Sequence, residues 1–290
     1  MGYLPANNFG MLPEGYSSYK EAKVAVLPVP YGATSSYISG TQNGPDAIIK
    51  ASHNMELFDK DLGYIAECGI HTMNHLAPAG DPKKMVSDVE DAYLHLRKGN
   101  KFVAMFGGEH SISTGAVSAL KREYPKMSVL QLDAHTDLRD EWEGSKHSHA
   151  CVMKRISEIC PFVGVGIRSM GEDEFELIKE NKFREYYAED ILKRNAILDN
   201  AISDLSNDVY LTIDLDFFDP SVVPAVGTPE PGGLDWYTTL NFLRKVFEKK
   251  NIIGLDIVEL CPIAGNHISD FTAAKLAYTL IGLKSRKGFE

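Results

Sequence analysis

Short runs of apolar residues, most of them rich in Val and Ile at consecutive positions, recur along the whole chain. A short run without polar alternation is typical of a β-strand that is buried on both faces of a sheet. The pattern therefore predicts strands at 23–29, 101–108, 127–133, 162–167, 208–216 and 251–260.

Segments with apolar residues at helical spacing lie between these runs. They predict helices at 45–58, 111–124, 172–181, 189–205, 235–250 and 270–287. Strands that alternate with helices are joined by right-handed crossovers and form a mostly parallel sheet. The pattern thus predicts the α/β class of folds.

The chain shows no internal repeat, low-complexity tract or linker that would divide it. We therefore expect a single domain over residues 1–290, with 1–22 as an N-terminal extension. Two segments rich in glycine and proline, 28–45 and 224–234, are expected to form long loops over a functional site.

Composition narrows the classes of partner. The formal net charge is −10, which argues against sequence-independent binding of nucleic acid, because that binding needs a basic surface. The four cysteines form no CxxC pair, so neither a disulfide framework nor a thiolate zinc site is expected. No apolar run reaches membrane-spanning length and the first residues lack a signal pattern. We expect a cytoplasmic protein with no nucleic-acid or membrane partner.

Polar residues lie at the ends of three of the predicted strands. In the extended stretch after strand 127–133, side chains two positions apart project to the same side, and buried carboxylates crowded there are costly without a cation. The candidates are His110, Asp133, His135, Asp137, Asp214 and Asp216. Plainer interpretations exist, with His110 as a surface or helix-capping residue and Asp137 as a helix cap.

Taken together, the six residues indicate a metal centre. Two imidazoles and four carboxylates, without a thiolate, suit Mn²⁺ better than a structural Zn²⁺ site, and six ligands are enough for two ions. Two such ions about 3.5–4 Å apart lower the pKa of a bridging water and supply hydroxide at neutral pH. The predicted chemistry is hydrolysis.

Six motifs resemble, in the same order, those of the ureohydrolase family of arginase and agmatinase, and the resemblance runs from about Pro28 to the last helix. They are GGEH at 107–110, DAHTDL at 133–138, SHA at 148–150, DLDFFDP at 214–220, GTPEPGG at 227–233 and DIVEL at 256–260. The resemblance implies a three-layer α/β/α fold and a homo-oligomer, a trimer or hexamer. It also implies an enzyme with two Mn²⁺ per chain that cleaves a guanidinium group to urea and an amine.

The resemblance also implies roles for the six candidate ligands. One manganese would be held by His110, Asp133, Asp137 and Asp214, and the other by Asp133, His135, Asp214 and Asp216. Asp133 and Asp214 would therefore bridge the two ions, and hydroxide bound between the ions would attack the guanidinium carbon.

Two further residues match motifs of the family. His149 resembles the histidine that passes a proton to the leaving amine, although Ala150 stands where the family usually has glycine, a departure that agmatinase-like members share. Glu259 resembles the glutamate that binds the guanidinium, a planar cation suited to a carboxylate. Asp256, three residues earlier on the same strand, faces elsewhere and is expected to be structural.

The sequence favours agmatine as the substrate, cleaved to urea and putrescine. The stretch 166–171, GIRSMG, lacks the aspartates of the arginase motif GLRDVD, and the loop after Asp137 carries Asp140, Glu141 and Glu143. An acidic loop attracts a second cationic end and repels a carboxylate. A free solvated loop is the plainer interpretation of these three residues.

Alternatives to agmatine hydrolysis are kept open. Another guanidine is one, namely aminopropylagmatine, guanidinobutyrate or arginine, and aminopropylagmatine satisfies the same features as agmatine. An amidohydrolase of the related deacetylase type with a single zinc is a second alternative. A binding or regulatory subunit without catalysis is the third, although none of the six candidate ligands is missing.

Overall fold

The computed structural model describes residues 8–289, and the first seven residues of the expected N-terminal extension lie outside them. Its centre is a sheet of eight strands in which every neighbouring pair is parallel. In order across the sheet, the strands are β4 (Ile70–Thr72), β1 (Val24–Val29), β5 (Phe102–Gly107), β10 (Asn251–Val258), β9 (Asp208–Asp214), β6 (Ser128–Leu132), β7 (Phe162–Ile167) and β8 (Arg184–Tyr187).

All six predicted strands are confirmed, and each is almost wholly buried. The apolar pattern missed the two edge strands, β4 and β8. Each is short and only partly buried, so neither shows the continuous apolar run that marks a strand covered on both faces. A small separate hairpin, β2 (Phe58–Asp59) and β3 (Gly63–Tyr64), was missed as well.

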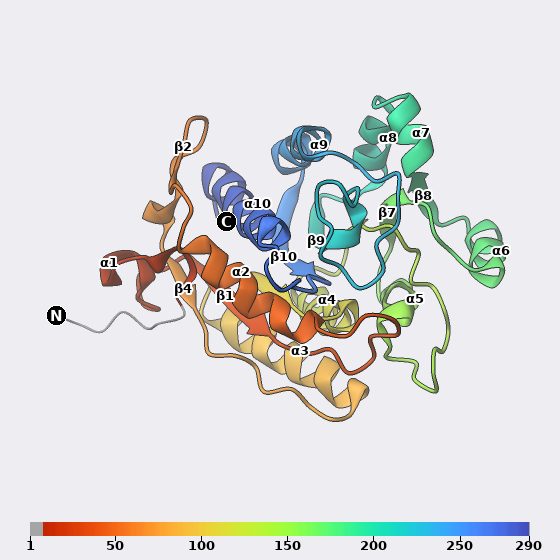
Figure 1. The fold of residues 1–290 in the computed structure, drawn as a ribbon, viewed down its shortest axis with the longest axis horizontal. Coiled ribbons are helices and arrows are strands. Elements are labelled where there is room, and N and C mark those ends of the chain that lie inside the picture. Colours follow the sequence, from red (N-terminus) through yellow and green to blue (C-terminus); the bar gives the residue numbers. More distant parts are fainter. Residues whose placement is uncertain (1–7, 290) are drawn as a thin grey trace.

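Helices cover both faces of the sheet (Figure 1). One buried cluster joins the sheet to α2 (Gly44–Ser52), α7 (Ala188–Lys193), α8 (Ile197–Asp204), α9 (Trp236–Lys249) and α10 (Ile268–Lys287). A second cluster joins the opposite face to α3 (Pro82–Lys98), α4 (Ser113–Glu123), α5 (Val152–Ser157) and α6 (Glu172–Asn181). This arrangement confirms the three-layer α/β/α fold.

Several predicted helices differ in detail. The helix expected over 45–58 ends at Ser52, and the one expected over 189–205 is divided into α7 and α8. The pattern missed α3, although Met85, Val89, Tyr93 and Leu96 are buried at helical spacing. Charged residues fill the other face of α3, so the window as a whole is polar, and only packing on α4 shows which stripe is apolar.

The described part of the expected N-terminal extension packs on the domain. Phe9 and Leu12 are fully buried, and the ring of Phe9 lies 5.3 Å from that of Phe106 on β5. Phe106 immediately precedes the turn that leads to His110, so this segment covers the base of a strand end that carries candidate ligands. A helix long and apolar enough to span a membrane is not found among residues 8–289.

The order of the strands places the candidate ligands together. Four central neighbours, β5, β10, β9 and β6, end at the same edge of the sheet. His110 lies just beyond β5, Glu259 directly after β10, Asp214 at the last position of β9 and Asp133 directly after β6. Ligands of open α/β sheets bind at this carboxyl edge, where the loops converge.

We expect Gly108→Ala to destabilise the protein. The amide of Gly108 donates to the carbonyl of Val29 at 2.9 Å, and a Cβ at this position would overlap the carbonyl of Tyr31. Overpacking of this kind costs about 1–3 kcal/mol and occasionally more, and a clash with backbone has little freedom to relax. Chemical denaturation should show a free energy of unfolding lowered by about 3 kcal/mol.

Gly80→Ala is the matched control, because no heavy atom lies within 4 Å of the Cβ that it would add. It should unfold like the parent protein. Equal stability of the two alanine variants would contradict the close packing at Gly108.

Candidate metal centre and pocket

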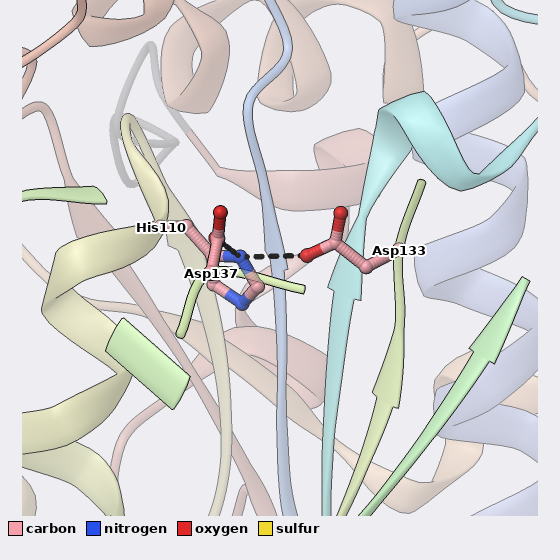
Figure 2. A group of neighbouring side chains, drawn as sticks. All are labelled: His110, Asp133 and Asp137. Carbon is pink, nitrogen blue, oxygen red and sulfur yellow. Dashed lines mark ion pairs between the residues drawn. The ribbon is translucent and has the colours of Figure 1, made fainter. Parts of the chain in front are cut away.

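His110 is the centre of the first group of candidate ligands. Its side chain is buried, and Nδ1 lies 3.2 Å from Oδ2 of Asp133, 3.2 Å from Oδ2 of Asp137 and 3.5 Å from Oδ2 of Asp214. Figure 2 shows the carboxylates of Asp133 and Asp137 directed at this nitrogen. Despite the short distances, Nδ1 has no well-oriented hydrogen-bond partner. An orphaned imidazole nitrogen among carboxylate oxygens fits a metal ligand.

His135 is the centre of the second group. Its Nδ1 lies 2.8 Å from Oδ2 of Asp216 and 3.7 Å from Oδ1 of Asp133. The ligand atoms of these three residues are close enough to hold one ion, and so are those of His110, Asp133 and Asp137. Asp133 belongs to both groups. The structure therefore brings all six predicted ligands to one place, with Asp133 shared between the two groups.

Backbone amides hold the carboxylates in place. Asp133 Oδ1 accepts from the amide of His135 at 2.7 Å, Asp214 Oδ1 accepts from that of Asp216 at 2.9 Å, and Asp216 Oδ1 from that of Ala134 at 3.0 Å. The second oxygens of Asp133 and Asp214 lie 3.2 and 3.5 Å from Nδ1 of His110, and that of Asp216 lies 2.8 Å from Nδ1 of His135. Oδ2 of Asp133 also accepts from Nε2 of Gln131 at 2.9 Å. A carboxylate held through one oxygen presents the other for coordination in a defined direction.

The charges at this edge are strongly perturbed. Burial and the neighbouring Asp133 raise the pKa of Asp137 to about 7, and burial with Asp216 and Asp133 raises the pKa of Asp214 well above its usual range. Burial opposes a charge on His135, but the carboxylates of Asp216 and Asp133 raise its pKa to about 12. Carboxylates that repel one another in a buried site are stabilised as anions by bound cations. The set of residues thus fits two divalent ions.

A pocket with a volume of about 220 Å³ opens above the ligands. Asp137, Asp214, Asp216 and His135 lie at its base, and Glu259 and His149 also line it. Both long loops expected over the site reach the pocket, 28–45 through Ser35–Ile38 and 224–234 through Gly227 and Thr228.

Glu259 has one oxygen bound and one available. It follows the last residue of β10 directly, its backbone has a positive φ of 64°, and it lines the pocket. Oε1 accepts from the amide of His110 at 2.7 Å. Burial and the nearby Glu109 raise the pKa of Glu259 well above its usual range, so a cation in the pocket would stabilise its charged form.

His149 stands at the wall of the pocket beside the loop 28–45. Its amide donates to Oγ1 of Thr34 at 3.0 Å, and its Nε2 lies 3.3 Å from Oγ of Ser36. Burial lowers the pKa of His149, which Glu109 partly opposes. Glu109 itself accepts from the amide of Thr34 at 2.6 Å. The glutamate of the GGEH motif thus anchors the loop on which His149 rests.

The acidic loop is placed differently from the rest of the predicted site. Asp140 pairs with Lys146 at 2.9 Å and with Arg155 at 2.5 Å, and these partners lower its pKa to about 2. Glu141 and Glu143 are exposed. None of the three lines the pocket, to which the loop instead contributes Arg139 and Trp142. Contact of the acidic residues with substrate remains a prediction.

Sequence reasoning missed an apolar and aromatic part of the pocket wall. It consists of Tyr37, Ile38, Trp142 and Met170. The guanidinium of Arg139 lies 4.4 Å from the centre of the Trp142 ring and 3.7 Å from Glu174. No motif marks these residues, and only the meeting of three separate loops brings them to one wall.

Comparisons with known proteins agree with this geometry. The family model described as "Arginase family" matches residues 22–282. The N(1)-aminopropylagmatine ureohydrolase of Synechocystis sp. is 43% identical over 93% of this chain and 91% of its own length. The agmatinase of Pyrococcus horikoshii is 36% identical over 92% of this chain and 94% of its own length.

A solved structure, the agmatine ureohydrolase of Thermoplasma volcanium, superposes with a TM-score of 0.88 at 31% identity, covering 97% of this chain and 95% of that one. The match to the family model spans nearly all of the chain, including every predicted metal ligand. The chain therefore belongs to the arginase family, and it is a ureohydrolase of that family.

Proposed function

We propose that the protein hydrolyses a guanidine with a cationic far end, N1-aminopropylagmatine in the first place and agmatine in the second, at a centre of two Mn²⁺. The observation that carries the proposal is the pocket, which is lined by several carboxylates together with apolar and aromatic side chains. Methylene groups suit the wall, and ammonium groups are attracted to aromatic faces and to the acidic field.

Arg139, which lines the pocket, and Arg168, which does not, give little support for a substrate with a carboxylate. Arg139 lies over Trp142 and near Glu174. Arg168, in the stretch that corresponds to the arginase motif, donates to backbone carbonyls, including that of Asp216 at 2.7 Å and that of Glu230 at 2.8 Å. Arg168 therefore holds two loops together and is not free to bind a substrate.

The relatives support the longer substrate over agmatine. The Synechocystis enzyme, named for N(1)-aminopropylagmatine, is 43% identical to this chain, whereas the Pyrococcus agmatinase is 36% identical. Both substrates present the same guanidinium to the metal centre. They differ only at the far end, which is remote from the guanidinium group.

The residues of this chain have separable roles in the proposed reaction. The six candidate ligands would hold two ions, which would lower the pKa of a water molecule and so supply the nucleophile. Glu259 binds the guanidinium through the oxygen that His110 leaves available. His149 is mostly neutral at pH 7 because burial lowers its pKa. It therefore takes up a proton during the attack and passes the proton to the departing amine.

A urea-release assay on a panel of guanidines with added Mn²⁺ tests the substrate. We expect aminopropylagmatine and agmatine to be hydrolysed with higher kcat/KM than guanidinobutyrate or arginine, whose carboxylates meet an acidic pocket. Preference for arginine would overturn the proposed substrate. No urea from any guanidine would favour a binding subunit, and about one zinc per chain in metal analysis would favour the deacetylase-type chemistry.

Asp137→Asn should remove both metal and activity. Substitution of residues that only hydrogen-bond to metal ligands already lowers metal affinity or activity by about 10–100-fold. Loss of a ligand itself should therefore lower kcat/KM by roughly 100-fold or more. Elemental analysis should show less manganese per chain. Asp91→Asn, an exposed change on α3, is the control and should keep both. A fully loaded and active Asp137→Asn protein would refute the ligand assignment.

Glu259→Gln should leave the metal in place and weaken catalysis. Glutamine still accepts the amide of His110 but loses the charge that binds the guanidinium. A hydrogen bond to a charged group contributes about 1.5–3 kcal/mol, so kcat/KM should fall by roughly 10–100-fold. The contrast with Asp137→Asn separates the roles, because manganese content should change in only one of them. An unchanged kcat/KM would exclude Glu259 from substrate binding.

A further inference from the structure

The second nitrogen of His110 is bound beneath the metal centre. While Nδ1 faces the ligand carboxylates, Nε2 lies 2.8 Å from Oγ1 of Thr212 in the buried interior. Thr212 lies on β9 two positions before Asp214, so both side chains project to the same face of the sheet. The imidazole of His110 is thus hydrogen-bonded to the hydroxyl of Thr212, which lies deeper in the sheet than the ligand carboxylates.

The hydrogen bonds of Thr212 determine the direction of this contact. Its Oγ1 lies 2.6 Å from Oδ1 of Asp256, and a carboxylate only accepts, so the single hydroxyl proton of Thr212 is donated to Asp256. Oγ1 must then accept from His110, which places the imidazole proton on Nε2. The lone pair of the neutral ring is left on Nδ1, toward Asp133 and Asp137.

Asp256 is an unusual residue for such a position. It is fully buried, and in the described residues 8–289 no lysine or arginine forms an ion pair with it. Its other oxygen, Oδ2, accepts from the hydroxyl of Tyr210 at 2.6 Å. A buried carboxylate held by neutral donors is costly unless positive charge lies near. An ion bound at His110 would supply that charge through two hydrogen bonds.

The sheet register makes this arrangement rigid. Asp256 on β10 and Thr212 on β9 are direct partners across neighbouring parallel strands. Their side chains project from the same row, so the contact between them depends on backbone pairing and not on a mobile loop. Burial raises the pKa of Asp256, and His110 with the hydroxyls of Thr212, Tyr210 and Ser113 opposes that rise.

We propose that Asp256 and Thr212 are positioning residues of the metal centre. Acting through the hydroxyl of Thr212, the carboxylate of Asp256 holds the His110 ring with Nδ1 toward the ligand carboxylates. This raises the affinity of the site for the ion that His110 binds. The inference rests on the proposed metal centre, and it assigns a role to a residue that faces away from the pocket.

Titration of metal-free protein with MnCl₂ in a calorimeter tests this role without any activity measurement. Thr212→Val keeps the shape of the side chain but removes the hydroxyl, and it should weaken binding of manganese by about 10–100-fold. Thr212→Ser keeps the hydroxyl and should bind nearly as the parent does. Asp256→Asn keeps an acceptor but removes the charge, so it should also weaken binding.

Thr239→Val is the matched control, because Thr239 on α9 is an equally buried threonine whose hydroxyl donates to the carbonyl of Asp235, the N-cap of that helix. It should bind manganese like the parent. Parent-like affinity in both Thr212→Val and Asp256→Asn would overturn the inference. If Thr212→Val does not fold, Asp256→Asn and Thr212→Ser decide the question by the same titration.

The titration of the parent protein separates the two proposals. A parent chain that binds no manganese contradicts the proposed metal centre itself. A parent chain that binds manganese, with variants that bind it equally well, contradicts only the roles of Asp256 and Thr212. Thermal unfolding of each metal-free variant shows whether a weaker affinity for manganese reflects a general loss of stability. Loss of a buried threonine hydroxyl should lower the melting temperature of the control Thr239→Val as well, but not its affinity for manganese.

Discussion

The concentration of buried negative charge at the carboxyl edge of the sheet is the constraint on which the rest of this structure depends. Asp133, Asp137, Asp214 and Asp216 lie within reach of two imidazoles, in a place largely removed from water. Such a cluster is unfavourable by itself, because each anion loses hydration and repels the others. Its stability requires amide donors for some oxygens and cations for the others.

The protein meets this constraint in successive layers. Backbone amides of the loops hold one oxygen of Asp133, Asp214 and Asp216. Below them, the row of Thr212 and Asp256 holds His110 from behind. The inner layer therefore presents atoms that are suited to metal ions, and the outer layer determines how those atoms point. A site built on four central strands is more rigid than one built on loops alone.

The pocket above the ligands is assembled by a different principle. Loops from distant parts of the chain supply Tyr37, Trp142 and Met170, and no strand determines their positions. The end of the pocket with the candidate metal ligands is thus held by the sheet, whereas the wall that would contact the far end of a substrate is formed by loops. Relatives of this chain are named for different guanidines, N(1)-aminopropylagmatine in one case and agmatine in another.

Residue patterns alone predicted the fold class and the six central strands, because strands buried on both faces appear as continuous apolar runs. They also indicated the six ligand candidates, most of which are carboxylates or histidines spaced two residues apart at strand ends. They did not reveal that β10 lies between β5 and β9, that Asp256 reaches His110 through Thr212, or that Asp140 pairs with Arg155. These facts depend on which strands and loops become neighbours, and neighbours far apart in the chain leave no periodic signal in the sequence.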